Sequence, residues 1–258
     1  RLFDRLRAQS PSQFINCGVA EANMMGVAAG MALSGLRPIT YTITPFTTTR
    51  CLEQIRVDVA YHEAPVIIVG TGAGLSYASL GPTHHSLEDF AILRAIPNMR
   101  ILAPWDAICL RRVLQESLLD RTPTYIRIGK KGEKDVLPTD RVAGLGRLTE
   151  LSSGEGVAIV AVGTVAIEAV RAAEQLRESG ISATVSLAHT VKPLPEPDLK
   201  VLFASHRLVV TVEEHSAAAG FGESVVGFAH RSGYSGRVIP LGVPDYFLSK
   251  AGSQGYAR

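Results

Sequence analysis

One carboxylate, Glu21, opens a helix whose other residues are mostly small and apolar. A run typical of a buried strand, residues 14–17, stops at Gly18, and the helical pattern follows. Ser34-Gly35 and then Pro38 mark the end of this helix. An acid in the first turn of a helix complements the helix dipole, which is worth ~0.3–1 kcal/mol, and an isolated glutamate is best explained that way. A proton-transfer role for Glu21 therefore needs support from elsewhere in the chain.

Two adjacent histidines, His84 and His85, are the next candidates for chemistry. An imidazole titrates near neutral pH and can exchange a proton with a carbonyl oxygen or a hydroxyl. A His-His metal site is not expected, because nothing nearby supplies the remaining ligands at sensible spacing. Upstream, Gly70-Thr-Gly-Ala-Gly74 lacks the spacing of a dinucleotide loop, since Leu75 takes the place of the third glycine. We predict neither a metal site nor a nucleotide loop here.

The composition excludes several classes of function. The chain has 258 residues and a net charge of +2, with charged residues interspersed, so it carries no electrostatic signature for nucleic acid. No apolar run approaches the ~20 residues that span a bilayer. Cys17, Cys51 and Cys109 are odd in number and far apart, which favours a reduced, cytoplasmic protein. We expect neither a nucleic-acid partner nor a membrane partner.

Alternating strands and helices must position these residues. Short apolar runs predict buried parallel strands at residues 65–69, 100–103, 123–128, 157–162, 183–187 and 207–212. Helical patterns separate them at residues 86–95, 106–119 and 165–178. The fold class is therefore α/β, with two open, mainly parallel-sheet domains. We place the first domain at residues 1–135, a polar, glycine-bearing linker at 136–146 and the second domain at 147–258.

Several motifs, in a fixed order, resemble the C-terminal half of transketolase, a thiamine diphosphate enzyme. They are Gly18-Val-Ala-Glu21, the segment 65–89 with Gly81-Pro-Thr-His84, Lys192-Pro-Leu194, Val212-Glu-Glu-His215 with Gly220-Phe-Gly222, and Leu241-Gly-Val-Pro-Asp245. The resemblance covers nearly the whole chain. It implies a pyrimidine-binding domain, lacking its N-terminal part, followed by the transketolase C-terminal domain. It also implies a structural role for Val212-Glu-Glu-His215, near the domain interface.

The resemblance gives roles to three residues. Glu21 matches the glutamate that hydrogen-bonds ring nitrogen N1′ of the aminopyrimidine and drives its tautomerisation, so that the cofactor can deprotonate its own thiazolium carbon. Phe46 stands where the family places an aromatic ring against the aminopyrimidine, although an ordinary core phenylalanine is an equal alternative. His84 matches the histidine that faces the substrate. We predict Glu21 and His84 as catalytic, and Glu21 and Phe46 as cofactor-binding.

Four positions concern the choice of substrate. Transketolases often have a histidine where this chain has Gly72 and an aspartate where it has Leu80. Because those residues usually contact hydroxyls of a sugar donor, an ordinary ketose phosphate is not the expected preference. His85 replaces a glutamine usual in the family, and its role is open. Lys130 falls near an arginine that binds substrate phosphate in relatives, although a solvated linker lysine is an equal alternative.

A missing motif implies a partner. The family holds the diphosphate through Mg²⁺ with a Gly-Asp-Gly…Asn motif on a separate domain, and this chain has none. The resemblance therefore implies a pyrophosphate-binding N-terminal transketolase subunit. Gly26, Ala29 and Gly30 would let a second copy pack closely through the pyrimidine domain, which gives an α2β2 heterotetramer. Because the family extends further in both directions, we expect the native termini to lie beyond Arg1 and Arg258.

The function implied is that of the C-terminal subunit of a split transketolase-like enzyme. It would transfer a two-carbon ketol unit from a ketose-type donor to an aldehyde acceptor. The enzymatic alternatives are the beta subunit of a 2-oxo acid dehydrogenase, which Gly-Pro-Thr-His84 and Val-Glu-Glu-His215 match less well, or a deoxyxylulose phosphate synthase-like enzyme. A non-catalytic paralogue that stabilises or regulates a partner is the alternative of another class. The intact Glu21 argues against it, while Gly72 and Leu80 keep it open.

Overall fold

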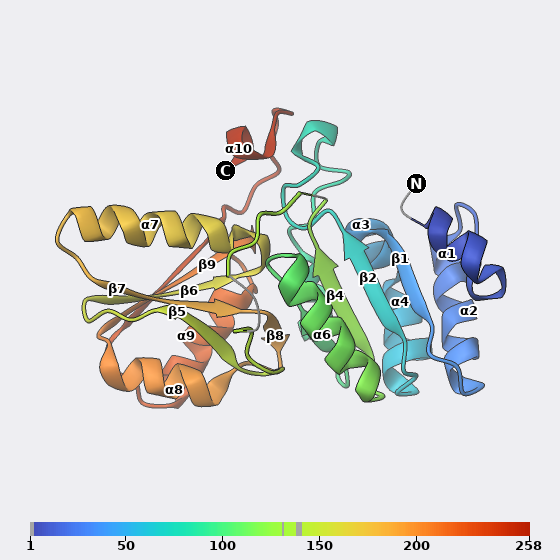
Figure 1. Ribbon diagram of the computed structural model, residues 1–258, viewed down its shortest axis with the longest axis horizontal. Helices are drawn as coiled ribbons and strands as arrows, with labels where there is room; N and C mark the ends of the chain where they lie inside the picture. Colours follow the sequence, from blue (N-terminus) through green and yellow to red (C-terminus); the bar gives the residue numbers. More distant parts are fainter. Residues whose placement is uncertain (1–2, 131, 138–140) are drawn as a thin grey trace.

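The computed structural model describes residues 3–130, 132–137 and 141–258, and within them two five-stranded sheets lie side by side (Figure 1). The first sheet contains, in spatial order, β1 (Ile39–Ile43), β2 (Ile67–Thr71), β4 (Thr124–Ile128), β3 (Arg100–Leu102) and β8 (Thr190–Lys192). The second contains β10 (Arg237–Val243), β9 (Leu208–Ser216), β6 (Val157–Val162), β7 (Ala183–Ala188) and β5 (Leu148–Ser152). The prediction of two mainly parallel α/β sheets is confirmed.

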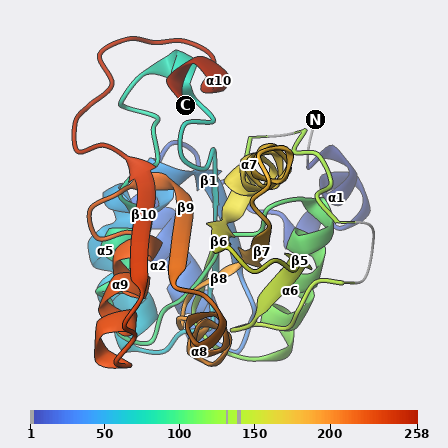
Figure 2. The same ribbon diagram turned by 90° about the vertical axis from the view of Figure 1, so that its left-hand side faces the viewer.

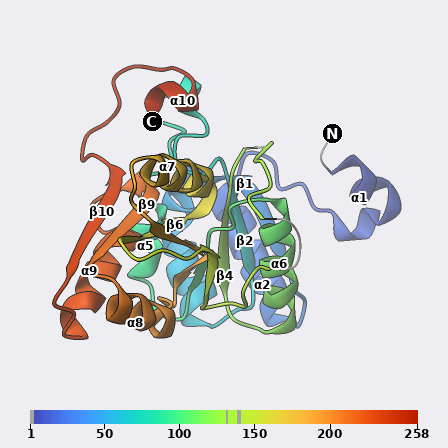
Figure 3. The same ribbon diagram turned by 60° about the vertical axis from the view of Figure 1, so that its left-hand side comes forward.

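Helices cover both faces of these sheets. The α-helices are α1 (Asp4–Gln9), α2 (Glu21–Leu33), α3 (Thr44–Thr47), α4 (Leu52–Gln54), α5 (Asp89–Arg94), α6 (Ala107–Leu119), α7 (Ala166–Glu178), α8 (Glu196–Ser205), α9 (Phe221–Arg231) and α10 (Gln254–Ala257). Short helical turns of other types are η1 (Pro11–Gln13), η2 (Thr49–Cys51), η3 (Ile55–Tyr61), η4 (Ala78–Leu80) and η5 (Gly163–Val165). In Figure 3, α1 protrudes from the body, while α10 packs beside the loop that carries η4 (Figure 2).

The apolar strands are apolar throughout because both of their faces are buried. In β2, Ile67 packs into the same core cluster as α6, and the next residue, Ile68, packs into the cluster that contains α2. In β6, Ile159 belongs to the cluster that contains α6, and the next residue, Val160, belongs to the cluster that contains α2. Neighbouring residues of a strand point to opposite faces, so a strand covered on both sides needs a continuous apolar run.

Most element ends match the sequence patterns, but one helix begins later than expected and one residue of another helix is buried, not outward-facing. Asp106 caps α6 by accepting the N–H of Cys109 at 2.8 Å, so that helix occupies residues 107–119 as expected. The helix expected from residue 86 begins at Asp89 instead, because Ser86 forms a bridge with Gly74. The helix α2 ends at Leu33 as expected, but Ala29 is buried in the core of this chain and does not face outward, so our prediction for it was wrong.

The second half of the chain contributes one strand to the first sheet. The strand β8 comes from the segment beyond the expected linker, yet it joins the first sheet, antiparallel to β3, with Ile101 opposite Lys192. The described residues of that linker, 136–137 and 141–146, form no helix or strand, and residues 138–140 lie outside the described part. The sequence patterns did not predict the pairing of β8 with β3.

A buried arginine on β4 joins the two sheets. Arg127 is 4% exposed, pairs with the Asp89 carboxylate at 3.3 Å and lies over the ring of Phe90, 4.4 Å from its centroid. Its guanidinium donates to the backbone oxygen of Ser86 at 2.6 Å and to that of Glu214, on the second sheet, at 2.7 Å. A buried charge with this many partners holds the surrounding segments in one arrangement.

The end of β9 supplies the other half of this junction. Glu213 accepts the N–H groups of Phe221 and Gly222 at the start of α9, each at 2.8 Å. The Glu214 carboxylate accepts the N–H of Leu75 from the first sheet's loop at 2.7 Å. The ring of His215 stacks on Phe90 with a centroid distance of 5.1 Å. All these contacts are structural, in agreement with the role predicted for this segment.

Replacing Arg127 with methionine should strongly destabilise the protein. The substitution leaves the Asp89 carboxylate buried without its cation, which costs about 3–5 kcal/mol of the free energy of unfolding. Urea denaturation of the two proteins measures the change. The control is Arg56→Ala, which removes an exposed arginine paired with Glu53 and should leave the denaturation midpoint nearly unchanged. An Arg127→Met protein as stable as the control would contradict the proposed role of the junction.

The stability of the chain should depend on His215 in mildly acidic solution. Its Nδ1–H donates to the oxygen of Ser216 and its Nε2 accepts the N–H of Ala91, which requires a neutral ring, and burial lowers its pKa from 6.5 to about 4. Below pH 6.5 the unfolded chain binds a proton that folded His215 refuses, so stability falls as the pH drops towards 4, by about 3 kcal/mol in full. Glu213 acts in the opposite sense, because burial raises its pKa to about 7.

His215→Phe separates the two contributions. The variant keeps Glu213 and the stacking on Phe90, so its stability relative to wild type should rise as the pH falls from 6.5 to 4. Urea midpoints across this range give the difference. A difference that stays constant with pH would mean that His215 is not the acid-sensitive group.

Candidate active site

Glu21 is the first residue of α2, and its carboxylate is mostly shielded from solvent. Gly18, in the turn before the helix, has a φ of +70° and donates its N–H to the side chain of Asn16 at 2.9 Å. The Glu21 side chain is 11% exposed, and its Oε2 accepts a hydrogen bond from Arg50 Nη1 at 2.8 Å. This bond holds the pKa of Glu21 below its ordinary value, although partial burial works in the opposite direction. Glu21 is therefore an ionised carboxylate with one cationic partner.

Phe46 lies between Arg50 and His84. It belongs to the short helix α3, which follows β1, and the guanidinium of Arg50 lies over its ring at 4.2 Å from the centroid. On the other side, the ring of His84 meets Phe46 edge-on with a centroid distance of 5.3 Å. Cys51 donates to the backbone oxygen of Phe46, and burial raises the pKa of its thiol to about 11, so it stays neutral. The structure thus brings together three of the predicted residues, Glu21, Phe46 and His84.

Glu21, Arg50, Phe46 and His84 form a row of neighbouring side chains. Tyr77 and Lys130 continue this row. The rings of Tyr77 and His84 are 6.2 Å apart, and the Lys130 ammonium lies 5.0 Å from the centre of the Tyr77 ring. Gly72 lies under this ring: a Cβ atom there would be 2.2 Å from Tyr77 Cε2, and its φ of +89° also favours glycine. Tyr77 therefore fills the space that a side chain at position 72 would need.

Two predicted substrate residues stand apart from this row. Leu80 belongs to η4 and is 52% exposed. His85 is buried at 5% exposure, and its Nε2 has no hydrogen-bond partner among the described residues. Among the described residues, no hydrogen bond, ion pair or ring contact joins either side chain to Glu21, Phe46 or His84.

The parallel register of two strands explains why the row forms. β1 and β2 pair in parallel, and their last residues, Ile43 and Thr71, lie opposite each other. Phe46 follows β1 by three residues and Gly72 follows β2 directly, so both loops start at the same edge of the sheet. In open α/β sheets, the carboxyl ends of the strands are where ligands usually bind.

Sequence reasoning missed Arg50 and Tyr77. Arg50 follows Phe46 by four residues, but the two residues belong to separate helical turns, α3 and η2, so helix periodicity alone does not predict their contact. Tyr77 lies in an irregular loop without periodicity, and only the tertiary structure shows that its ring covers Gly72.

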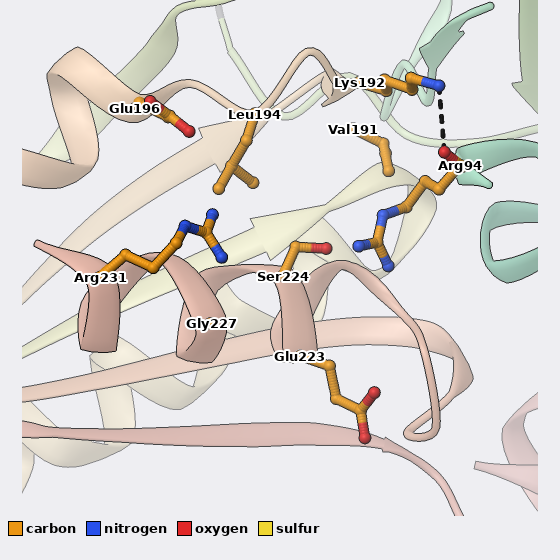
Figure 4. Close-up of a pocket in the computed structure, with 9 residues that line it drawn as sticks. All are labelled: Arg94, Val191, Lys192, Leu194, Glu196, Glu223, Ser224, Gly227 and Arg231. Atoms are coloured by element: carbon orange, nitrogen blue, oxygen red, sulfur yellow. Dashed lines mark hydrogen bonds between the residues drawn. The ribbon is translucent and has the colours of Figure 1, made fainter. Parts of the chain in front are cut away.

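A cavity of about 330 Å³ lies elsewhere, between α5 and α9 (Figure 4). The guanidinium groups of Arg94 and Arg231 flank Ser224 there, and Lys192 donates to the backbone oxygen of Arg94 at 3.0 Å. Arg94 itself donates to the backbone oxygens of Ala219 and Gly220. None of the residues predicted to do chemistry lines this cavity. Two of its cations, Arg94 and Lys192, bind carbonyl oxygens across the junction of the two sheets.

The described residues contain neither a metal-binding cluster nor a membrane-spanning helix. No group of three or more His, Cys, Asp or Glu side chains is arranged to hold a metal ion there. In the same part of the chain, no helix is long and apolar enough to cross a membrane.

Both halves of the chain are similar to known protein families. Residues 1–132 match the family described as transketolase, pyrimidine binding domain, and residues 146–255 match transketolase, C-terminal domain. A subunit of the apulose-4-phosphate transketolase of Phocaeicola vulgatus is 36% identical over 91% of this chain and 75% of its own length. The 1-deoxy-D-xylulose-5-phosphate synthase of Aquifex aeolicus is 38% identical over 92% of this chain, but only 38% of its own length is covered.

A solved structure has the same fold over almost the whole chain. It is described as "Split gene transketolase, inactive beta4 tetramer", with 33% identity and a TM-score of 0.87. The match covers 97% of this chain and 82% of the other. This chain therefore belongs to the transketolase family and corresponds to the C-terminal subunit of a split enzyme.

Proposed function

We propose that this chain transfers a two-carbon ketol unit from a ketose-type donor to an aldehyde acceptor, with thiamine diphosphate as cofactor. The observation that carries the proposal is the row in which a shielded carboxylate (Glu21), an aromatic face (Phe46) and an imidazole (His84) follow one another at the carboxyl ends of β1 and β2. A carboxylate can exchange a proton with a ring nitrogen, an aromatic face can hold the ring, and an imidazole can exchange a proton with a reacting carbonyl oxygen.

The geometry of the row fits the aminopyrimidine ring of that cofactor. The Arg50 guanidinium is planar and carries N–H donors, and it already lies on the Phe46 ring while bonding Glu21. A flat, nitrogen-bearing group is therefore accommodated between this aromatic face and this carboxylate. When bound, thiamine diphosphate supplies the nucleophilic carbon that the reaction needs.

Each residue of the row has a distinct task. With the cofactor bound, Glu21 would hold a proton for ring nitrogen N1′, Phe46 would orient the ring by stacking, and His84 would exchange a proton with a carbonyl oxygen or hydroxyl of the substrate. His84 reaches this position because its ring contacts both Phe46 and Tyr77. The tasks are those that the family resemblance implied for Glu21, Phe46 and His84.

We propose that a pyrophosphate-binding N-terminal transketolase subunit holds the diphosphate and Mg²⁺. Next to Glu21, the apolar side chains of Ile15 and Val19 are 57% and 94% exposed, which is expected where a partner covers the surface. The open side of α2 carries Gly26 and Gly30, around which an added Cβ would meet nothing within 4 Å. Two copies packed there, each with one partner, give an α2β2 assembly.

The substrate is a small sugar or ketose, and the wall that contacts it is less polar than in many transketolases. Tyr77 fills the space that a histidine at position 72, usual in transketolases, would need, and Leu80 is apolar. Lys130, whose ammonium lies beside Tyr77, can bind an anionic group of the substrate. His85 is buried and would act only through its neighbours. We also propose the domain limits 1–135 and 147–258, which the two sheets support.

Glu21→Gln should abolish or severely reduce turnover in the assembled enzyme. An amide cannot hold and release the required proton, so we expect the rate of ketol transfer to fall about 10²- to 10⁴-fold with assembly intact. The assay mixes this chain with its pyrophosphate-domain subunit, thiamine diphosphate, Mg²⁺ and a panel of ketose donors. Glu53→Gln, an exposed glutamate paired with Arg56, is the control and should keep full activity.

Two results would contradict the proposal. An active Glu21→Gln complex would contradict the proton-transfer role of Glu21. Full activity from the isolated chain would contradict the claim that a second subunit is required. Decarboxylation of a 2-oxo acid without ketol transfer would favour a 2-oxo acid dehydrogenase or deoxyxylulose phosphate synthase-like enzyme. A wild-type mixture that assembles but turns over no donor would favour a non-catalytic paralogue.

Gly72→Ala should destabilise the chain more than Gly81→Ala does. Both glycines have a positive φ, but an added Cβ meets the Tyr77 ring at position 72 and nothing within 4 Å at position 81. The first substitution should cost about 1–3 kcal/mol more than the second because of overpacking. Adding Tyr77→Ala should remove that excess, as a double-mutant cycle from urea denaturation would show. Equal costs at positions 72 and 81 would mean that Tyr77 does not fill the space above Gly72.

A further inference from the structure

Arg50 occupies the place into which the cofactor ring has to enter. We propose that, in the cofactor-free chain, the Arg50 guanidinium is an intramolecular competitor of the aminopyrimidine and that cofactor binding displaces it. This inference rests on the proposed function, and it adds a device that keeps the Glu21 site filled until the cofactor arrives.

The contacts of Arg50 are those that the cofactor ring needs. Its Nη1 donates to Glu21 Oε2 at 2.8 Å, and its guanidinium lies on the Phe46 ring at 4.2 Å from the centroid. Two planar groups cannot stack on the same face of one aromatic ring, and a ring seated there would have to take the place of the Arg50 guanidinium in front of the Glu21 carboxylate. Cofactor binding at Glu21 and Phe46 therefore excludes the observed position of Arg50.

The charge state at Glu21 also has to change. The hydrogen bond from Arg50 keeps Glu21 ionised, and the other groups around it, the neutral thiol of Cys51 and the ring of Phe46, offer no competing cation. A carboxyl group that serves ring nitrogen N1′ needs a proton in place of that cation. Arg50 thus opposes the cofactor in two ways, by covering the aromatic face and by stabilising the carboxylate without its proton.

The device can open because Arg50 is held weakly. Its side chain is 47% exposed, and Glu21 and Phe46 are its partners among the described residues. An exposed ion pair and an exposed cation–π contact are each weak in water. The guanidinium can therefore move into solvent, unlike that of Arg127, which is buried among several acceptors.

Calorimetric titration of thiamine diphosphate and Mg²⁺ into the assembled complex tests this inference. The Arg50→Ala complex should bind the cofactor about 3- to 10-fold more tightly than wild type, since two weak competing contacts are lost. Arg50→Lys, which keeps the charge but not the planar face, should lie between them. Arg56→Ala, an exposed arginine with a different partner, is the control and should match wild type.

A second measurement needs no assembly. Carbon-13 NMR of the Glu21 carboxyl group in the isolated chain should give a pKa below the ordinary range for wild type and one nearer that range for Arg50→Ala. Equal or weaker cofactor binding by Arg50→Ala, or an unchanged Glu21 pKa, would overturn the inference. Failure of every complex, wild type included, to bind the cofactor would instead overturn the proposed function, and the carboxyl titration would still show whether Arg50 holds Glu21.

Discussion

The buried guanidinium of Arg127 is the interaction on which the arrangement of the two sheets depends. It binds Asp89 and the oxygen of Ser86 on one side and the oxygen of Glu214 on the other. Once a charge is removed from water, each unmade contact is costly, so the segments around it have little freedom. The carboxylate of Glu214 extends the same junction to the amide of Leu75. The loop between β2 and α5 is thereby fixed near its start by Glu214 of the second sheet and near its end by Arg127.

The candidate active site uses that fixed loop. Tyr77 and His84 lie on it, while Glu21 and Phe46 come from segments next to β1. The parallel pairing of β1 and β2 starts the two segments at one edge, and the junction around Arg127 holds the loop against Phe46. The second sheet supplies no residue of the row, but its contacts determine where His84 lies.

The two arginines illustrate how solvent sets the role of a charge. Arg127 is 4% exposed and bonded to carbonyl oxygens that cannot move away, so its charge holds the fold together. The side chain of Arg50 is 47% exposed, and its partners among the described residues, Glu21 and Phe46, are groups that a ligand can also use. Water can solvate the second guanidinium when it leaves, so the same chemical group becomes exchangeable. The difference in burial explains why Arg127 has a structural role and why the Arg50 guanidinium can be displaced.

Local sequence was enough to predict the α/β class, the limits of α2 and α6, and the family with its candidates Glu21, Phe46 and His84. These features depend on strand and helix periodicity, caps and short motifs, which act over a few residues. Long-range packing decided the rest. The pairing of β8 with β3 and the packing of the Tyr77 ring over Gly72 depend on segments that are distant along the chain. The inward position of Ala29 depends on how α2 is rotated against its neighbours. No local pattern encodes such contacts, because they exist only after the sheets have assembled.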